Sequence, residues 1–238
     1  MNSQFSRSEI LLGVEAINKL NSSHVAVFGV GGVGGYVVEA LARAGIGGID
    51  LIDNDEVCLS NLNRQIIALH STLGKYKVDV ARERCLDINP EIKVNTFKMF
   101  YSYENASEFD FRKYDYIVDA IDTISSKILL IENAKKYGIP IISAMGAGNK
   151  LNATDFKVAD IAKTKGCPLA KIIRKELRKR NIEHLKVVYS EEKRILPIMV
   201  NVNQEERVIG SVSYVPSVVG LIMAGEIIKD ICIVEKGL

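Results

Sequence analysis

A run of glycines directly after an apolar pentapeptide limits the fold of this chain more than any other feature. Residues 24–28 (HVAVF) have the continuous apolar pattern of a buried strand, and a helix is predicted to run to about Arg43. Between them, Gly29, Gly31 and Gly34 form G-x-G-x-x-G. The first glycine allows a tight turn, the second lets a phosphate approach the backbone, and the third packs the helix on the strand. Free N–H groups at the helix start bind anionic oxygen, so the sequence predicts a nucleotide-binding α/β fold.

Strand-like and helix-like segments alternate along the rest of the chain, which is the order of an α/β fold. Further strands are predicted at 49–52, 94–97, 116–121, 139–144, 186–190 and 208–215. Helices are predicted at 8–20, at 76–86, at 126–137, within 163–186, and from Pro216 onward. The apolar face of the first of these helices consists of Ile10, Leu11, Val14 and Ile17. We therefore expect a Rossmann-like, doubly wound, mainly parallel sheet with a C-terminal elaboration.

Composition fits one globular domain and excludes several other classes of protein. The chain has 238 residues, of which 47% are hydrophobic and 25% are charged, with a net charge of +2. We expect one domain over 1–238, with a nucleotide-binding core at 1–150 and an elaboration for substrate or dimer contacts at 151–238. No apolar run is long enough to span a bilayer, and the N-terminus lacks the apolar core of a signal peptide. The four cysteines form no CxxC pair, so we expect a cytoplasmic protein without a zinc knuckle or disulfide framework.

Polar residues beyond the glycines favour ATP over a dinucleotide. Asp53 ends the next predicted strand, nineteen residues after Gly34, where it can accept hydrogen bonds from a ribose. A dehydrogenase that binds NAD would share these features, but hydride transfer needs no further cations. Arg64, Lys77 and Asp122 all fall near the carboxyl edge of the predicted sheet. Phosphoryl chemistry on ATP uses fixed cations of this kind, together with an Asp that can hold Mg²⁺.

Four motifs extend this reading to a known family. GVGGVG, LIDNDEVCLSNLNRQ, GKYKV and DAID closely resemble the E1-like (ThiF/MoeB/HesA) adenylating superfamily, from about Arg7 to Met145. That resemblance implies a homodimer that transfers AMP from MgATP to a carboxylate, with Asp122 as the Mg²⁺ ligand. The nucleotide site that it implies consists of Gly29, Gly31, Gly32, Gly34, Asp53, Asp55, Asn61, Arg64, Gln65, Lys77 and Asp122. The catalytic residues would be Arg64, Lys77, Asp122 and Arg7, and Arg7 resembles the arginine that family members insert into the partner's ATP site.

The second part of the chain looks like the tRNA threonylcarbamoyladenosine dehydratase branch of that superfamily. The matching stretches are residues 160–170 (DIAKTKGCPLA), 188–192 (VYSEE) and 210–220 (GSVSYVPSVVG). The resemblance implies adenylation of the threonyl carboxylate on a modified adenosine next to the tRNA anticodon. The carbamoyl group would then attack internally and close a five-membered ring. No enzyme nucleophile is needed for this step, so Cys167, with no base beside it in the sequence, is interpreted as an incidental thiol.

A basic stretch within 163–186 is the expected contact with RNA. Its apolar residues follow a helical stripe, and the stretch contains nine Lys and Arg residues but only two Glu residues. The RNA contacts that we predict are Arg174, Lys175, Arg178 and Lys179. A solvated cationic face is the alternative meaning of such a run.

Two other function classes stay open on the sequence alone. One is an adenylyltransferase that activates the C-terminus of a ubiquitin-like sulfur-carrier protein, and it is disfavoured by the missing CxxC pairs. The other is a non-catalytic or NAD-binding protein, disfavoured by Arg64, Lys77 and Asp122. Whether a sulfur-transfer protein is an additional partner is a question that the sequence leaves open.

Overall fold

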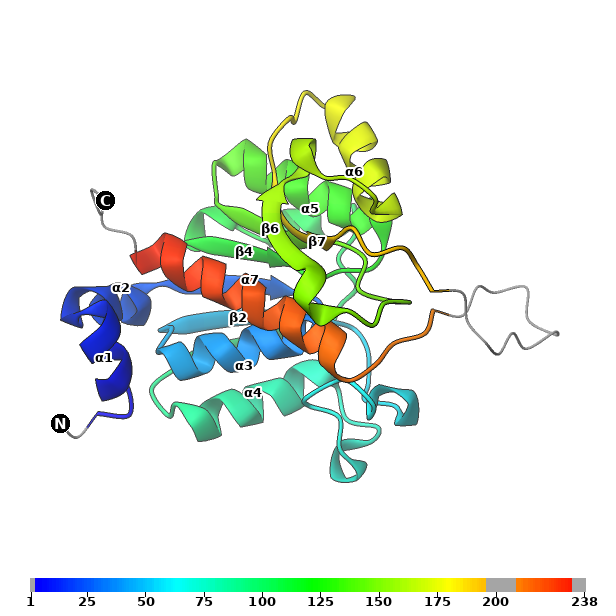
Figure 1. The fold of residues 1–238 in the computed structure, drawn as a ribbon. Coiled ribbons are helices and arrows are strands. Elements are labelled where there is room, and N and C mark those ends of the chain that lie inside the picture. Colours follow the sequence, from blue (N-terminus) through cyan, green and yellow to red (C-terminus); the bar gives the residue numbers. More distant parts are fainter. Residues whose placement is uncertain (1–2, 196–208, 233–238) are drawn as a thin grey trace.

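A single mainly parallel sheet organises the molecule (Figure 1). The computed structural model describes residues 3–195 and 209–232. Within these residues seven strands lie in the order β3-β2-β1-β4-β5-β7-β6. Their bounds are His24–Phe28 (β1), Gly48–Ile52 (β2), Lys93–Phe97 (β3), Tyr116–Asp119 (β4), Ile141–Ala144 (β5), Phe156–Asp160 (β6) and Lys186–Ser190 (β7). Neighbouring strands pair parallel except β6 and β7, which pair antiparallel. The predicted doubly wound sheet is thereby confirmed.

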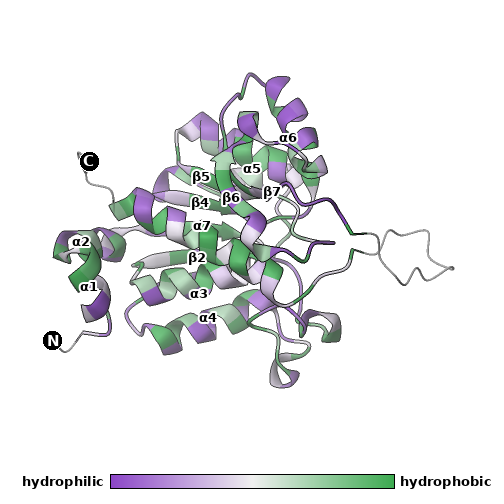
Figure 2. Ribbon diagram, viewed as in Figure 1, coloured by the Kyte–Doolittle hydropathy of each residue, from purple (hydrophilic) through white to green (hydrophobic). Residues whose placement is uncertain are grey.

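Helices cover both faces of the sheet, which explains why its central strands are apolar throughout. Val25 and Val27 of β1 face one hydrophobic cluster, and Ala26 and Phe28 face the other. The first cluster lies under α2 (Val14–Ser22), α3 (Gly34–Ala44), α4 (Lys77–Ile88) and α7 (Tyr214–Cys232). The second lies under α5 (Ile124–Tyr137) and α6 (Pro168–Arg178). Figure 2 shows the strands largely in the green of hydrophobic residues, whereas α6 has purple hydrophilic segments.

The last helix crosses back to the start of the fold. α7 runs beside α3 in Figure 1 and packs closely against it. A Cβ atom at Gly220 would lie 2.4 Å from the carbonyl oxygen of Val33, which directly precedes α3. A Cβ at Gly32 would lie 3.4 Å from the Cβ of Pro216. The C-terminal helix is therefore part of the wall behind the glycine loop.

Three predictions at the element level were wrong. The helix expected at 8–20 is two helices, α1 (Ser6–Leu12) and α2, because the chain turns at Gly13. Ile10, Leu11 and Val14 are exposed, so only the C-terminal part of the expected apolar face packs on the core.

The C-terminal part differs from prediction as well. The strand expected at 208–215 is absent from the described residues there, because 209–213 form no regular element and α7 begins at Tyr214, two residues before Pro216. Residue 208 lies outside the described residues. β6 was not predicted, and it adds an edge strand that pairs antiparallel with β7. Among the described helices, none has the length and apolar character needed to cross a membrane.

Candidate active site

A cavity of about 970 Å³ opens at the carboxyl ends of the parallel strands. Its lining includes Gly29 after β1, Asp53 after β2, Ala120 after β4 and Met145 after β5. β1 lies between β2 and β4, so the connections leave it in opposite directions at this point of the sheet. Ligands of doubly wound sheets bind at this switch point. The expected location of the site therefore coincides with a cavity.

The glycine loop has room for no side chain at two of its positions. Gly29 has φ +89°, and a Cβ there would lie 2.6 Å from the carbonyl oxygen of Ala120. A Cβ at Gly34 would lie 1.8 Å from the carbonyl oxygen of Gly29. Gly31 and Gly32 line the cavity, whereas Gly34 lies behind it at the start of α3. Gly34 thus packs the helix onto the strand, and the other glycines leave the backbone open to a phosphate.

Asp53 is held by the backbone beside this loop. Its Oδ2 accepts a hydrogen bond from the Val30 N–H at 2.7 Å, and its Oδ1 accepts one from the Asp55 N–H at 2.9 Å. Burial raises the pKa of Asp53, against the opposing effect of the Lys77 ammonium and the two N–H groups. Each carboxylate oxygen retains a lone pair for a further donor. The side chain is therefore fixed in place with capacity to accept ribose hydroxyls.

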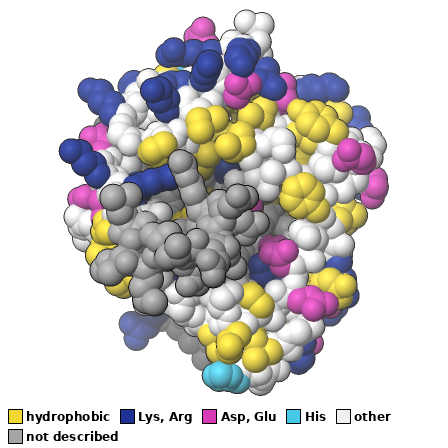
Figure 3. Space-filling view, turned by 90° about the vertical axis from the view of Figure 1, so that its right-hand side faces the viewer, with side chains coloured by type: hydrophobic (Ala, Val, Ile, Leu, Met, Phe, Trp, Pro, Cys, Tyr) yellow, Lys and Arg dark blue, Asp and Glu magenta, His cyan; other side chains and the backbone are white. Residues whose placement is uncertain are grey.

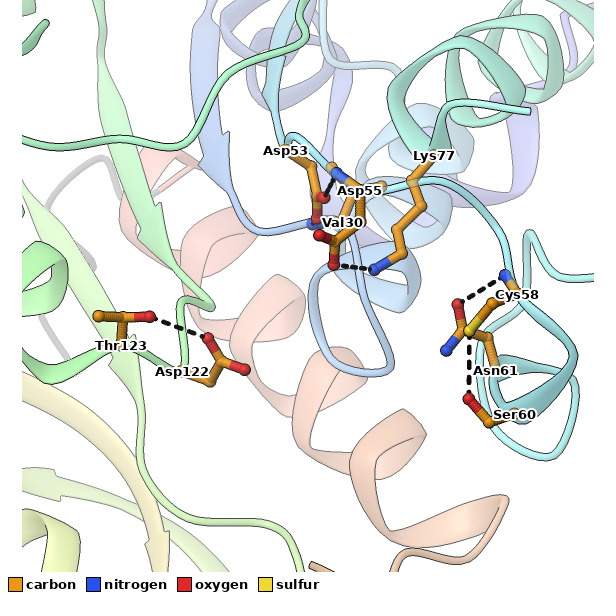
Figure 4. A network of polar contacts seen from close by, with 9 residues as sticks. All are labelled: Val30, Asp53, Asp55, Cys58, Ser60, Asn61, Lys77, Asp122 and Thr123. Atoms are coloured by element: carbon orange, nitrogen blue, oxygen red, sulfur yellow. Dashed lines mark hydrogen bonds and ion pairs between the residues drawn. The ribbon is translucent and has the colours of Figure 1, made fainter. Parts of the chain in front are cut away.

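Lys77 places a buried ammonium at the edge of the cavity. It is the first residue of α4, and its Nζ lies 2.6 Å from Oδ2 of Asp55. The Lys77 side chain is buried, whereas the Asp55 carboxylate is largely exposed. Figure 4 shows Asp53, Asp55 and Lys77 grouped beside the loop that contains Val30. Because an ammonium has three donors, Lys77 retains donors for phosphate oxygens while Asp55 orients it.

The segment after β2 contributes three more polar side chains. Asn61 is buried, and its Oδ1 accepts the N–H of Cys58 at 3.2 Å. Arg64 is half-buried and donates through Nη1 to Ser60 O and to Asn63 Oδ1, both at 2.9 Å. These contacts show how the segment orients its amide and guanidinium groups along the cavity wall.

Gln65 has an unusual environment for a buried amide. Throughout residues 3–195 and 209–232, its Oε1 is the one buried side-chain polar atom without a hydrogen-bond partner. Its side chain lines the cavity, and its Nε2 is the nearest atom to a Cβ built on Gly31, at 3.7 Å. A buried acceptor without a partner costs about 1–3 kcal/mol. A ligand or solvent donor in the cavity would remove that cost, which fits a polar ligand such as a nucleotide.

Asp122 lies in the segment after β4, to the left of Asp53, Asp55 and Lys77 in Figure 4. It is exposed, lines the cavity, and has Thr123 Oγ1 3.4 Å from its Oδ1. In the described part of the chain, no three His, Cys, Asp or Glu side chains gather as a metal site. Mg²⁺ in nucleotide sites is commonly held by one or two carboxylates plus phosphates, so a single exposed Asp fits it as a ligand.

One buried ionic network was not predicted. Lys127 in α5 and Asp119 at the end of β4 have fully buried side chains, with Nζ 2.8 Å from Oδ2. Lys127 Nζ also donates to Ser143 Oγ at 3.2 Å and to Ala144 O at 3.0 Å, and Ser143 Oγ donates to the same Asp119 Oδ2 at 2.5 Å. The network joins the ends of β4 and β5, from which the segments 120–122 and 145–148 enter the cavity wall. The one signal in the sequence is a lysine within the apolar run of α5.

Two groups of predicted residues lie away from this cavity. Arg7 is exposed on α1, which lies at the left of Figure 1, and it does not line the cavity of its own chain. On α6, Lys175, Arg178 and Lys179 are exposed, and Lys179 pairs with Glu176 at 2.6 Å.

Arg174, the remaining predicted residue of α6, has structural contacts. Arg174 Nη1 donates to Ile161 O, Thr164 O and Thr164 Oγ1, at 3.2, 2.9 and 2.6 Å. Arg174 therefore braces the segment before α6. Cys167, which precedes Pro168 at the start of α6, is buried.

Comparison with known proteins gives the family. A model described as the ThiF family matches residues 5–236. The chain belongs to the ThiF family. It is 45% identical over 239 residues to a tRNA threonylcarbamoyladenosine dehydratase of Bacillus subtilis, covering 96% of this chain and 94% of that protein.

Two further comparisons separate the candidate functions. The crystal structure of Escherichia coli tRNA N6-threonylcarbamoyladenosine dehydratase in complex with AMP superposes with a TM-score of 0.88. That match has 33% identity and covers 96% of this chain and 93% of the other. The adenylyltransferase and sulfurtransferase UBA4 of Vanderwaltozyma polyspora is 40% identical over 147 residues, but these are 61% of this chain and 34% of that protein. Likeness to the dehydratases thus runs over nearly the whole chain.

Proposed function

We propose that this protein is an ATP-dependent tRNA threonylcarbamoyladenosine dehydratase. The observation that carries the proposal is the convergence of the predicted polar residues on one cavity: the site described above contains every predicted nucleotide contact except Gly34, which packs behind it. Near full-length likeness to enzymes of that name, one of them with AMP bound, supports the choice of substrate. A tRNA substrate is consistent with the expected cytoplasmic location.

In the first step, ATP would be bound with its ribose at Asp53 and its phosphates at the glycine loop. An oxygen of the threonyl carboxylate attacks the α-phosphorus, the bond to the β-phosphate oxygen breaks, and diphosphate leaves. Lys77 and Arg64 stabilise the charge that gathers on the phosphate oxygens. Mg²⁺, when bound at Asp122, supplies further neutralisation of the leaving diphosphate. The products of this step are an acyl-adenylate and diphosphate.

The second step needs orientation more than it needs an enzyme nucleophile. The carbamoyl group, already part of the substrate, attacks the acyl carbon, loses a proton, and displaces AMP as the ring closes. Intramolecular attack of this kind has effective molarities of about 10⁵ M or more. The buried Cys167 and the absence of any Cys among the residues that line the described cavity agree with a route without an acyl-thioester.

Diphosphate exchange tests this assignment. Lys77→Ala is expected to reduce ATP–diphosphate exchange in the presence of threonylcarbamoylated tRNA by at least about 100-fold, because the phosphates lose a fixed cation. Asp122→Ala is expected to do the same, with partial recovery at high Mg²⁺. Lys75→Ala is the matched control, since Lys75 is exposed two residues away and does not line the cavity. Wild-type exchange rates in the first two variants would refute the assignment.

Activation of a carrier protein is the second candidate, and the partial likeness to UBA4 is the observation that favours it. The products separate the two functions. Mass analysis of nucleosides from tRNA incubated with protein and ATP should show the loss of one water from the threonylcarbamoyl nucleoside. An AMP adduct on a ubiquitin-like carrier, with no change in the tRNA, would establish the other activity. Docking of a sulfur-transfer protein stays a prediction.

A homodimer would explain the position of Arg7. Ile10 and Leu11 on the same helix are 73% and 81% exposed, so α1 presents apolar side chains to the surface. We infer that a second copy covers this helix and receives Arg7 in its ATP site, as the family resemblance implies. Mixing inactive Arg7→Ala with inactive Lys77→Ala protein is then expected to restore activity, because each mixed dimer has one site with both groups. Failure of the mixture to recover, with mixed dimers shown to form, would exclude a shared site.

The exposed cations of α6 would contact tRNA phosphates. Replacing Lys175, Arg178 and Lys179 with Ala is expected to weaken tRNA binding and to reduce the slope of log affinity against log salt by about one per lost contact. ATP affinity should be unchanged. Arg174→Ala is expected instead to lower stability, because its guanidinium bonds to the segment before the helix. An unchanged salt slope in the triple variant would remove α6 from the RNA contact.

A further inference from the structure

The buried ammonium of Lys127 is saturated with acceptors from its own chain. Its three N–H groups are matched by Asp119 Oδ2 at 2.8 Å, Ser143 Oγ at 3.2 Å and Ala144 O at 3.0 Å. The side chains of Lys127, Asp119 and Ser143 are buried, and these three residues lie outside the lining of the cavity described above. We call them the strand-end network. Because the ammonium has no donor left for a ligand, the network can affect the reaction only through the segments attached to it.

Stability alone does not account for a charged pair at this place. Moving a carboxylate and an ammonium out of water is costly, and apolar side chains of similar volume often stabilise a core as well as a buried ion pair does. The pair differs from an apolar contact in having direction. It fixes the last residues of β4 and β5, Asp119 and Ala144, to one atom of α5. The network therefore determines where the chain leaves these two strands to form segments 120–122 and 145–148 of the cavity wall.

Asp122, the residue that would hold Mg²⁺, lies between two attachments to this network. On one side, the Ile121 N–H donates to Asp119 Oδ1 at 3.3 Å. On the other side, the Lys127 N–H donates to Thr123 O at 3.0 Å. The Asp122 side chain is exposed, and its contact with Thr123 Oγ1 is long, at 3.4 Å. Figure 3 views the molecule from the cavity side and shows magenta Asp and Glu side chains open to solvent on that face. The position of Asp122 therefore depends on its backbone, which the network holds.

The glycine loop is anchored separately from Asp122. The Gly29 N–H donates to Ile52 O at 2.8 Å. The Val30 N–H donates to Asp53 Oδ2 at 2.7 Å. Both acceptors lie at the end of β2, which is on the opposite side of β1 from β4. Figure 4 likewise shows Val30 and Asp53 on chain segments other than the one with Asp122. Loss of the network should thus displace Asp122 and leave most ribose and phosphate contacts in place.

We propose that the strand-end network positions Asp122 for adenylation, with Lys127 and Asp119 as positioning residues that do not touch the nucleotide. The inference rests on the proposed function, because it concerns the carboxylate that would hold Mg²⁺ there. Replacing residues that orient a metal ligand from behind commonly costs about 10- to 100-fold in metal affinity or activity. A misplacement of about 1 Å can have an effect of that size on the rate. The network supplies this precision from the core of the protein.

Nucleotide binding with and without Mg²⁺ tests the proposal. Asp119→Leu combined with Lys127→Met removes both charges at once, and Ser143→Ala is a milder variant that keeps the ion pair. Thermal unfolding identifies a temperature at which each variant is fully folded. Anisotropy of a fluorescent, non-hydrolysable ATP analogue should give wild-type affinity without Mg²⁺. The Mg²⁺ concentration that gives half of the Mg²⁺-dependent gain in affinity should rise about tenfold in the double variant and about threefold in Ser143→Ala.

Two further measurements distinguish positioning from a purely structural role. In ATP–diphosphate exchange, the double variant should have a kcat about tenfold lower and a KM for ATP within about twofold of the wild type. In an Asp122→Ala background, the same network changes should have no further effect on the Mg²⁺ response, because the network acts through that carboxylate. Lys135→Met, which replaces an exposed lysine of the same helix, should behave as the wild type in every measurement.

Two results would overturn the inference alone. One is a wild-type Mg²⁺ response in the folded network variants of an active enzyme, and Ser143→Ala decides this if the double variant does not fold. The other is equal weakening of analogue binding with and without Mg²⁺, because the network would then shape the whole cavity. A wild-type protein that neither binds the ATP analogue nor exchanges diphosphate would instead reject the proposed function together with this inference.

Discussion

Replacing Lys127 with methionine should leave a carboxylate without its counter-ion in a site without solvent. The side chains of Lys127 and Asp119 are fully buried, and Nζ lies 2.8 Å from Oδ2. Burial raises the pKa of Asp119, and the Lys127 ammonium opposes that effect. Without the ammonium, the folded state of lowest free energy has Asp119 protonated. Neutralising a carboxyl with an unfolded pKa of about 3.9 costs about 4 kcal/mol at pH 7, at 1.36 kcal/mol per pH unit.

The same arithmetic gives the pH dependence. Because the pKa of Asp119 in the folded variant is raised above its unfolded value, the stability of the variant falls as pH rises between those two values. The loss relative to wild type should therefore shrink from about 4 kcal/mol at pH 7 to about 1.5 kcal/mol at pH 5. For a chain of this size, 4 kcal/mol corresponds to a melting temperature roughly 8–16 °C lower.

Urea unfolding at pH 5, 6 and 7 measures this loss. Lys135→Met is the matched control, since Lys135 is exposed on the same helix and its replacement should cost less than about 0.5 kcal/mol at every pH. A loss in the Lys127 variant that does not vary with pH would refute the reasoning. In that case the destabilisation would come from lost packing and not from the buried charge.

Three further predictions concern other parts of the fold. Gly34→Ala should unfold the nucleotide loop, with a loss above about 3 kcal/mol by urea unfolding, because the new Cβ would lie 1.8 Å from the Gly29 carbonyl oxygen. Burial tends to raise the pKa of Asp50, but hydrogen bonds from His24, Tyr114 and Asn95 outweigh that effect and lower the pKa. The stability that the ionised Asp50 contributes is present above about pH 3.9 and is lost as pH falls further. Asp50→Asn should therefore show a smaller loss of stability between pH 5 and pH 3 than the wild type. Iodoacetamide at neutral pH should label Cys58 far faster than Cys85. The Cys58 thiol is exposed and its hydrogen bond with Ser60 lowers its pKa, whereas burial raises the pKa of Cys85 to about 12. Mass spectrometry of peptides over time measures the order of labelling, and faster labelling of Cys85 would contradict the prediction.

The location of the candidate site could be predicted because its determinants are local. Gly29, Asp53 and Asp122 each follow a strand end, and strand ends of a parallel sheet meet at one edge whatever their order. The residue spacing alone therefore placed these groups together. The family resemblance added Asn61 and Gln65, whose positions in an irregular segment have no such rule.

The features that were not predicted depend on tertiary contacts. Periodicity identified apolar positions at Ile10 and Leu11, but it does not show whether the same chain covers them. The residues before Pro216 favour a strand by composition. In the structure, Tyr214 and Val215 instead begin α7, which packs against α3. Lys127 reads as a surface residue because lysine is rarely buried, and only the structure shows Asp119 facing it.

The return of α7 to the first helical layer has a consequence for synthesis of the protein. The backbone at Val33 and Gly32 reaches its final surroundings only after Pro216 and Gly220 have been added to the growing polypeptide. Those two residues lie more than 180 positions later in the sequence than the glycine loop. A nascent product that stops before α7 therefore leaves that apolar layer open to chaperones.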